Sequence, residues 1–72
     1  MKNTKEVNRL EGTVEEMLPA AKFRVKLDDE RLIIGHLSGK MRKFRIKIVP
    51  GDRVLLEFSP YDKDLGRITR RL

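Results

Sequence analysis

The apolar residues of this chain recur at every second position in several short segments, which is the repeat of a β-strand with one buried face. The repeat is clearest in KFRVKLD, residues 22–28, where Phe23, Val25 and Leu27 share one face and basic residues occupy the other. Similar repeats predict four further strands, over residues 7–17, 31–37, 53–58 and 66–72. In the last two of these segments the residues expected inside are Val54, Leu56, Phe58 and Ile68.

The first of these segments has an interrupted repeat. Leu10, Gly12 and Val14 keep the period of two, and the alternation then slips at Glu15 and Glu16. Such a slip is typical of a β-bulge, which bends a strand, and an inward glycine eases the same bend. We therefore expect a long, bent strand that joins both halves of a small barrel. In the segment 31–37, we expect Ile33, Gly35 and Leu37 inside and His36 outside.

The connections complete the fold prediction. Residues 28–30 and Pro50-Gly51-Asp52 have turn composition, and Ser38 can cap a short helical turn that Met41 anchors on the barrel. Five strands with a helical turn between the third and the fourth indicate an all-β protein with a five-stranded OB-fold barrel. A five-stranded SH3-like barrel is the alternative, but it lacks this connector. We assign residues 7–72 to this single domain and residues 1–6 to a flexible arm without an apolar signal core.

The positive charge is concentrated in one segment. The chain has 17 Lys and Arg against 11 Asp and Glu, a formal charge of +6. No acidic residue lies between Arg31 and Gly51, where six basic residues occur, and the rest of the chain carries 11 charges of each sign. A localised positive field attracts polyanions such as nucleic acid. It also attracts an anionic membrane surface.

Catalytic and metal-binding patterns are missing. The chain has one histidine and no cysteine, and residues 28–30 lack the ligand spacing of a calcium loop. His36 and Ser38 have no acidic partner in sequence for nucleophilic catalysis, and the adjacent Glu15 and Glu16 point to opposite faces of a strand. We interpret the chain as a binding protein, not an enzyme, that needs no cofactor and no metal.

The run 40–47 is the strongest candidate for RNA contact. Its five cations are Lys40, Arg42, Lys43, Arg45 and Lys47, and contacts between such cations and phosphates make binding salt-dependent. Phe44, within the run, either stacks on an unpaired base or packs in the core, and Tyr61 has the same two interpretations. Two free aromatics at most favour recognition of folded RNA over successive stacking on a flexible strand.

The last predicted strand carries a second basic group, Arg67, Arg70 and Arg71. We expect Arg67 and Arg71 to share a face with Thr69, because the three positions are two residues apart. Arginine suits phosphate binding because its guanidinium is a planar fork. The alternative interpretation is an edge strand protected by charge.

The motifs also resemble a known family. The runs EGTVEEMLP (11–19), FRVKLD (23–28), HLSGKMRK (36–43), IVPGDRV (48–54) and SPYDKDLGRI (59–68) are similar, in order and spacing, to bacterial-type translation initiation factor 1. The chain departs from the family at Phe44 and Arg45, where Asn and Tyr are common, and at Lys47, where Arg is common. These departures bear on the details of contact rather than on the role.

The resemblance implies an S1-like OB fold that binds the A site of the small ribosomal subunit and keeps tRNA from entering prematurely. The implied partners are rRNA, a neighbouring ribosomal protein and initiation factors 2 and 3. The factor would act as a monomer, without a membrane, in the bacterial cytoplasm or the plastid stroma. By matching position, the implied rRNA contacts are His36, Lys40, Arg42, Lys43, Lys47, Arg67 and Arg71.

Two other functions are kept as alternatives. A cold-shock-like RNA chaperone would use the same barrel, but it needs an aromatic-rich strand face. An SH3-like protein-interaction module or a membrane-surface binder would use the charge without RNA, although no amphipathic membrane helix is evident.

Overall fold

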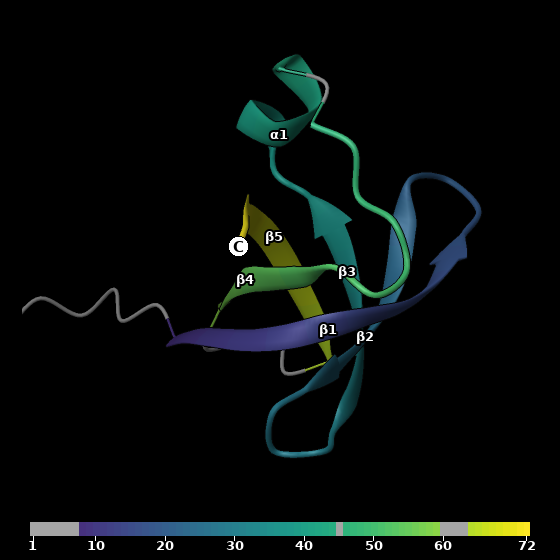
Figure 1. Cartoon of the computed structure of the whole chain (residues 1–72). Coiled ribbons are helices and arrows are strands. Elements are labelled where there is room, and N and C mark those ends of the chain that lie inside the picture. Colours follow the sequence, from purple (N-terminus) through teal and green to yellow (C-terminus); the bar gives the residue numbers. More distant parts are fainter. Residues whose placement is uncertain (1–7, 45, 60–63) are drawn as a thin grey trace, which may run out of the picture.

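A computed structural model describes residues 8–44, 46–59 and 64–72, which form a closed barrel with one short helix at its end (Figure 1). The strand order is β1-β2-β3-β5-β4, and every neighbouring pair is antiparallel except β3 and β5. The predicted all-β barrel with a helical turn between the third and fourth strands is confirmed. The elements are β1 (Asn8–Leu18), β2 (Lys22–Leu27), β3 (Leu32–Leu37), α1 (Gly39–Lys43), β4 (Arg53–Phe58) and β5 (Leu65–Arg71).

Strand β1 bends and pairs with two different neighbours. Its first half pairs with β4 and its second half with β2, and the register with β2 shifts between Val14 and Glu16. Glu15 is therefore the extra residue of the predicted bulge. Gly12 is buried, and a Cβ atom there would lie 2.8 Å from both the carbonyl oxygen of Lys26 and Cγ1 of Val25. The bend thus brings β2 so close that the site excludes a side chain.

The barrel interior is filled by the residues that the alternation predicts. Phe23, Val25 and Leu27 of β2 are buried together with apolar residues of the other four strands. Met41 of α1, with 2% of its surface exposed, closes one end of this core. The residues buried with them are Val14, Ile33, Ile48, Val54, Leu56, Phe58 and Ile68, while Leu10 and Leu37 pack against the cluster.

Ser38 fixes where α1 begins. Its side-chain oxygen accepts a hydrogen bond from the backbone N–H of Met41 at 3.2 Å, as an N-cap residue does. Its own backbone N–H donates to the carbonyl oxygen of Ile68 at 3.0 Å. The predicted cap is confirmed, and the second bond holds the helix beside β5.

The connector from α1 to β4 is fastened to the bulge of β1. The N–H of Gly51 donates to the carbonyl of Val14 at 2.8 Å, and the N–H of Val14 donates to the carbonyl of Asp52 at 2.9 Å. Gly51 has a φ of +96°, and the N–H of Asp52 bonds to the carbonyl of Val49 at 3.1 Å. These features confirm the predicted turn at Pro50-Gly51-Asp52, where proline and glycine suit their positions.

The turn between β1 and β2 is strained. Ala20 and Ala21 have φ values of 64° and 58°, a region that costs an L-residue about 1–2 kcal/mol. We expect Ala21→Gly to raise the free energy of unfolding by about 0.5–1 kcal/mol, because glycine removes this penalty and adds a smaller entropic cost. Ala21→Val should lower it, since a β-branched residue fits this region poorly. Urea unfolding measures both changes, and equal stability of the two variants would contradict the prediction.

Candidate nucleic-acid interface

Ion pairs engage most cations on the barrel wall. These pairs join neighbouring strands and turns, and apart from the more enclosed Glu57 their side chains are exposed or half-exposed. In the part of the chain that the structure describes, they are Arg9–Glu57, Arg24–Glu16, Lys26–Glu30, Arg31–Asp29, Arg53–Asp28, Arg53–Glu11 and Arg67–Glu57.

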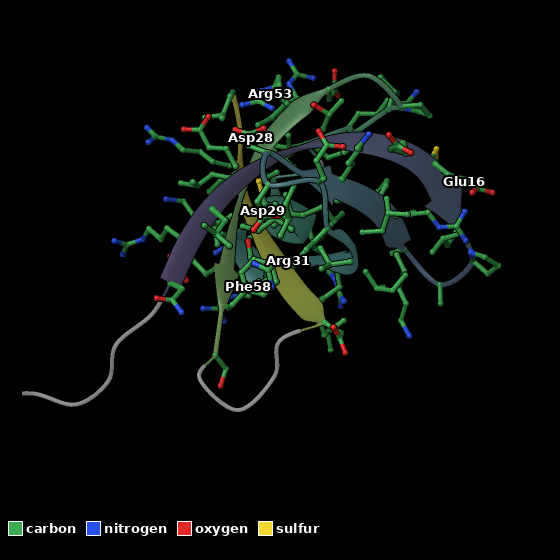
Figure 2. All side chains as sticks on the ribbon, turned by 90° about the horizontal axis from the view of Figure 1, so that it is seen from below. Glu16, Asp28, Asp29, Arg31, Arg53 and Phe58 are labelled. Atoms are coloured by element: carbon green, nitrogen blue, oxygen red, sulfur yellow. The ribbon has the colours of Figure 1, made fainter. Side chains whose placement is uncertain are left out.

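The β2–β3 turn, residues 28–30, has all three of its carboxylates paired. Asp28 accepts two hydrogen bonds from Arg53, at 2.7 and 3.1 Å, and Asp29 accepts from the backbone and side chain of Arg31 at 3.1 and 3.0 Å. Glu30 pairs with Lys26 at 3.0 Å. Figure 2 shows Asp28 near Arg53 and Asp29 beside Arg31, at the end of the barrel away from α1. This acidic turn is therefore occupied by its own cations.

Asp28 and Asp29 of this turn are also stabilised in their charged form. Hydrogen bonds from Arg53 hold the pKa of Asp28 below its ordinary value, and the backbone N–H of Arg31 does the same for the pKa of Asp29. Among residues 8–44, 46–59 and 64–72, no group of three or more His, Cys, Asp or Glu side chains is placed to hold a metal ion.

The cations without an ion pair gather around α1 and the end of β5. The side chains of α1 include three of them, all in its last turn, where positive charge suits the helix dipole. Arg71 donates from its guanidinium to the carbonyl of Lys47 at 3.1 Å, so its charge is not neutralised. Lys22, at the start of β2, is the one such cation elsewhere in the described chain. The cations near α1 are Lys40, Arg42, Lys43, Lys47, Arg70 and Arg71.

An open groove of about 730 Å³ lies between α1, the connector and β5. This volume is within the range of ligand-binding pockets. The lining includes four cations and no acidic residue, so the groove attracts anions. We call it the α1–β5 groove, lined by Lys40, Met41, Phe44, Ile46, Lys47, Thr69, Arg70 and Arg71.

A bulge in β5 decides which arginines face the groove. Arg67 lies opposite Glu57 and Arg70 opposite Leu55, but Arg71 lies opposite the buried Val54, because Thr69 is an extra residue in the register. The expectation that Arg67 and Arg71 share a face was therefore wrong, although Arg71 and Thr69 both line the groove. Arg71 and Arg70 line the groove, whereas Arg67 lies on the barrel wall in an ion pair.

Phe44 is on the surface rather than in the core. It is 62% exposed and lines the groove, with Nζ of Lys43 6.0 Å from its ring centroid. Phe23 and Phe58 are buried, as predicted. The structure therefore excludes a position in the core for Phe44, and the ring is available for stacking on a base. Arg45 and Tyr61, the other predicted contacts of uncertain role, lie outside the described residues.

The remaining predicted contacts lie in two places. Arg42 and Lys43 are exposed on α1 next to the groove. His36, half-buried on β3, lies between Lys22 of β2 and Arg67 of β5 in the strand register. The groove thus brings together Lys40, Lys47 and Arg71 from the predicted set and adds Arg70. The signal for Arg70 was its place in the basic group, but only the bulge brings it opposite Leu55, on the outer face of the sheet.

Residues 1–72 match the protein family described as Translation initiation factor 1A / IF-1. The chain belongs to this family. Members of the initiation factor 1 family take part in protein synthesis, which agrees with an OB-fold barrel that carries a groove lined by cations. In the described part of the chain, no helix has the length and apolar character needed to cross a membrane.

One solved structure supports the same assignment, and a second shares the fold. The barrel is similar to the solution structure of translation initiation factor 1 from the Wolbachia endosymbiont strain TRS of Brugia malayi, at 56% identity and a TM-score of 0.78, over 92% of this chain and 78% of that chain. It is also similar to YjeQ from Thermotoga maritima, at 29% identity and a TM-score of 0.72, over 90% of this chain and 23% of that chain. The second likeness is thus to a small part of a larger protein.

The Asp28–Arg53 pair makes a pH-dependent contribution to stability. Because the folded pKa of Asp28 is depressed, this contribution is present above the unfolded pKa of about 4 and is lost as the pH falls through the folded pKa. We expect Arg53→Gln to return the pKa of Asp28 toward 3.8 and to flatten the stability curve in this acidic range. Carboxyl NMR titration and unfolding below about pH 4 measure the two effects. An unchanged Asp28 titration would contradict the assignment.

Proposed function

We propose that this initiation factor 1 family member binds the A site of the small ribosomal subunit through rRNA, keeps tRNA from entering prematurely and assists initiation factors 2 and 3. The observation that carries this proposal is the α1–β5 groove, around which the unpaired cations of the described residues collect, with Lys22 as the exception. RNA phosphates neutralise such cations and release counterions. A monomer in the cytoplasm, or in a plastid stroma, fits this role.

The shape of the interface favours folded RNA. Helix α1 projects from one end of the barrel (Figure 1), so its cations can contact phosphates on both sides of a cleft. Of the described aromatic side chains, Phe44 alone is exposed, which suits one unpaired base among backbone contacts. A cold-shock-like chaperone needs several exposed aromatics in succession, so it ranks behind the A-site role.

The proposal predicts saturable, one-to-one binding to purified small subunits. Added salt should weaken this binding because phosphate contacts carry it, and a ligand of the A site should compete with it. Chemical footprinting of the subunit rRNA, with and without the protein, would locate the contact. Binding that is indifferent to salt and to the competing ligand would contradict the proposal, and equal affinity for any unstructured RNA would favour the chaperone.

Charge reversal on α1 tests the site. We expect Arg42→Glu combined with Lys43→Glu to abolish subunit binding while the fold persists, because both side chains are exposed and neither forms an ion pair with a described residue. Circular dichroism verifies the fold, and cosedimentation with small subunits measures binding. Unchanged affinity in a folded variant would move the site elsewhere.

Neutralising variants provide a matched control for this test. Arg42→Gln with Lys43→Gln should lower the slope of log affinity against log salt by about one for each lost phosphate contact. Lys26→Gln with Arg31→Gln removes the same charge from the opposite end of the barrel, where both cations pair with the β2–β3 turn. The control should leave the slope unchanged, and equal slopes for the two pairs would mean that only net charge matters.

Phe44 should contribute to affinity and not to stability. If its ring stacks on an unpaired base, Phe44→Ala should weaken RNA binding by about 1–3 kcal/mol. The same change should alter the free energy of unfolding by less than about 0.5 kcal/mol, because the side chain is outside the core. Phe44→Tyr, which keeps the ring, should bind normally. Subunit binding and urea unfolding decide the matter, and a large loss of stability would place the ring in a structural role.

A further inference from the structure

Arg9, Glu57 and Arg67 form a row across three adjacent strands. The register places Arg9 of β1 opposite Glu57 of β4 and Glu57 opposite Arg67 of β5. Each carboxylate oxygen of Glu57 takes one guanidinium: Oε2 lies 3.2 Å from Nε of Arg9, and Oε1 lies 3.0 Å from Nη2 of Arg67. One acid thus holds two arginines on the outside of the barrel.

The acid in this row is more enclosed than either of its partners. The Glu57 side chain is 19% exposed, against 64% for Arg9 and 54% for Arg67. Hydrogen bonds from Arg67 and then Arg9 hold the pKa of Glu57 below its ordinary value, so the carboxylate is charged at neutral pH. The row therefore carries a charge of +1, where two free arginines would carry +2.

The row ends on β5, the strand that also forms one side of the α1–β5 groove. Arg67 precedes Arg70 and Arg71 by three and four positions on β5. Because Thr69 is the extra residue of the bulge, the register with β4 separates them by only two and three positions, about 7–10 Å along a strand. Arg70 and Arg67 lie opposite Leu55 and Glu57, two alternate positions of β4, and therefore share a face of the sheet. An RNA chain that leaves the α1–β5 groove past Arg70 along β5 meets Arg67 next. Arg67 can contact a phosphate with its full positive charge only after its hydrogen bond to Glu57 is broken.

We propose that Glu57 determines specificity by withholding Arg67 from RNA that does not fit the groove. The arginine of this pair is 54% exposed, and an ion pair open to solvent on that side is weak enough to be exchanged for a phosphate that is held in place by other contacts. A flexible RNA lacks those contacts and gains little from the exchange. The inference rests on the proposed RNA-binding function and adds a positioning residue, Glu57, that does not itself contact RNA.

The test uses a short oligouridylate as the generic RNA and fluorescence anisotropy over a series of salt concentrations. Glu57→Gln should bind this RNA about two- to fivefold more tightly at low salt, the factor that corresponds to one exposed ion pair. The slope of log affinity against log salt should steepen by about 0.7, the value for one more phosphate contact on a single strand. Affinity for small subunits should rise less, so discrimination between the two falls.

Two variants separate this mechanism from a general effect of charge. Glu30→Gln adds the same charge and releases Lys26 at the far end of the barrel, and it should leave the slope unchanged. Glu57→Gln with Arg67→Gln should return the affinity for oligouridylate to that of the unaltered protein. If Glu57→Gln does not fold, Glu57→Thr, with a residue suited to strands, provides the same comparison.

Three results would overturn the proposal: unchanged or weaker oligouridylate binding by the folded Glu57 variant, an equal gain from Glu30→Gln, or a gain that persists without Arg67. The proposed ribosomal function fails by a different result, which is small-subunit binding that is indifferent to salt and to a ligand of the A site. The two failures are therefore distinguishable, because one is measured with oligouridylate and the other with small subunits.

Discussion

The fold depends on one strand that pairs with two partners. β1 can reach both β4 and β2 only because it bends at the Glu15 bulge, with Gly12 allowing the close approach of β2. This double pairing closes the sheet and leaves β3 beside β5 in parallel. The chain leaving β3 then meets the end of β5, where Ser38 bonds to Ile68. The groove exists because closure places α1 there.

Ion pairing on the wall makes the two ends of this barrel differ in charge. Exposed ion pairs contribute little to stability, typically about 0–1 kcal/mol each, so the pairs on the wall are better understood by what they remove. They neutralise cations over most of the barrel, while those near α1 keep their full charge. A modest net charge of +6 thus becomes a local field at one end, with the acidic β2–β3 turn at the other (Figures 1 and 2).

Local sequence signals were sufficient for most of the fold. Alternation identified the five strands and their buried residues, the slip at Glu15 identified the first bulge, and Ser38 identified the helix cap. Turn chemistry identified Gly51. The family motifs predicted the same fold. In HLSGKMRK, for example, the basic run directly follows the cap residue Ser38. Each of these signals acts over a few residues and therefore can be read from the chain alone.

The rest depends on partners that are distant in sequence. The second bulge, at Thr69, has no glycine to mark it and arises from how β5 meets β4. Without it, Arg67 and Arg71 looked equivalent, and Arg70 was left out of the candidate site. The pairing of Arg67 with Glu57 was likewise invisible, and the exposure of Phe44 was left open, because the alternating pattern ends before the connector. The sequence indicates how many cations there are, but only the folded sheet determines which ones stay free.

The double pairing of β1 also affects how the protein folds. Arg9 and Glu57 are 48 positions apart, so β1 finds its β4 partner only after most of the domain has left the ribosome that synthesises it. Barrels that depend on such non-local strand pairing fold slowly, in roughly milliseconds to seconds, because distant loops must close before their contacts form. Until then β1 exposes an unpaired edge, and the nascent chain is at its most vulnerable to aggregation during that interval.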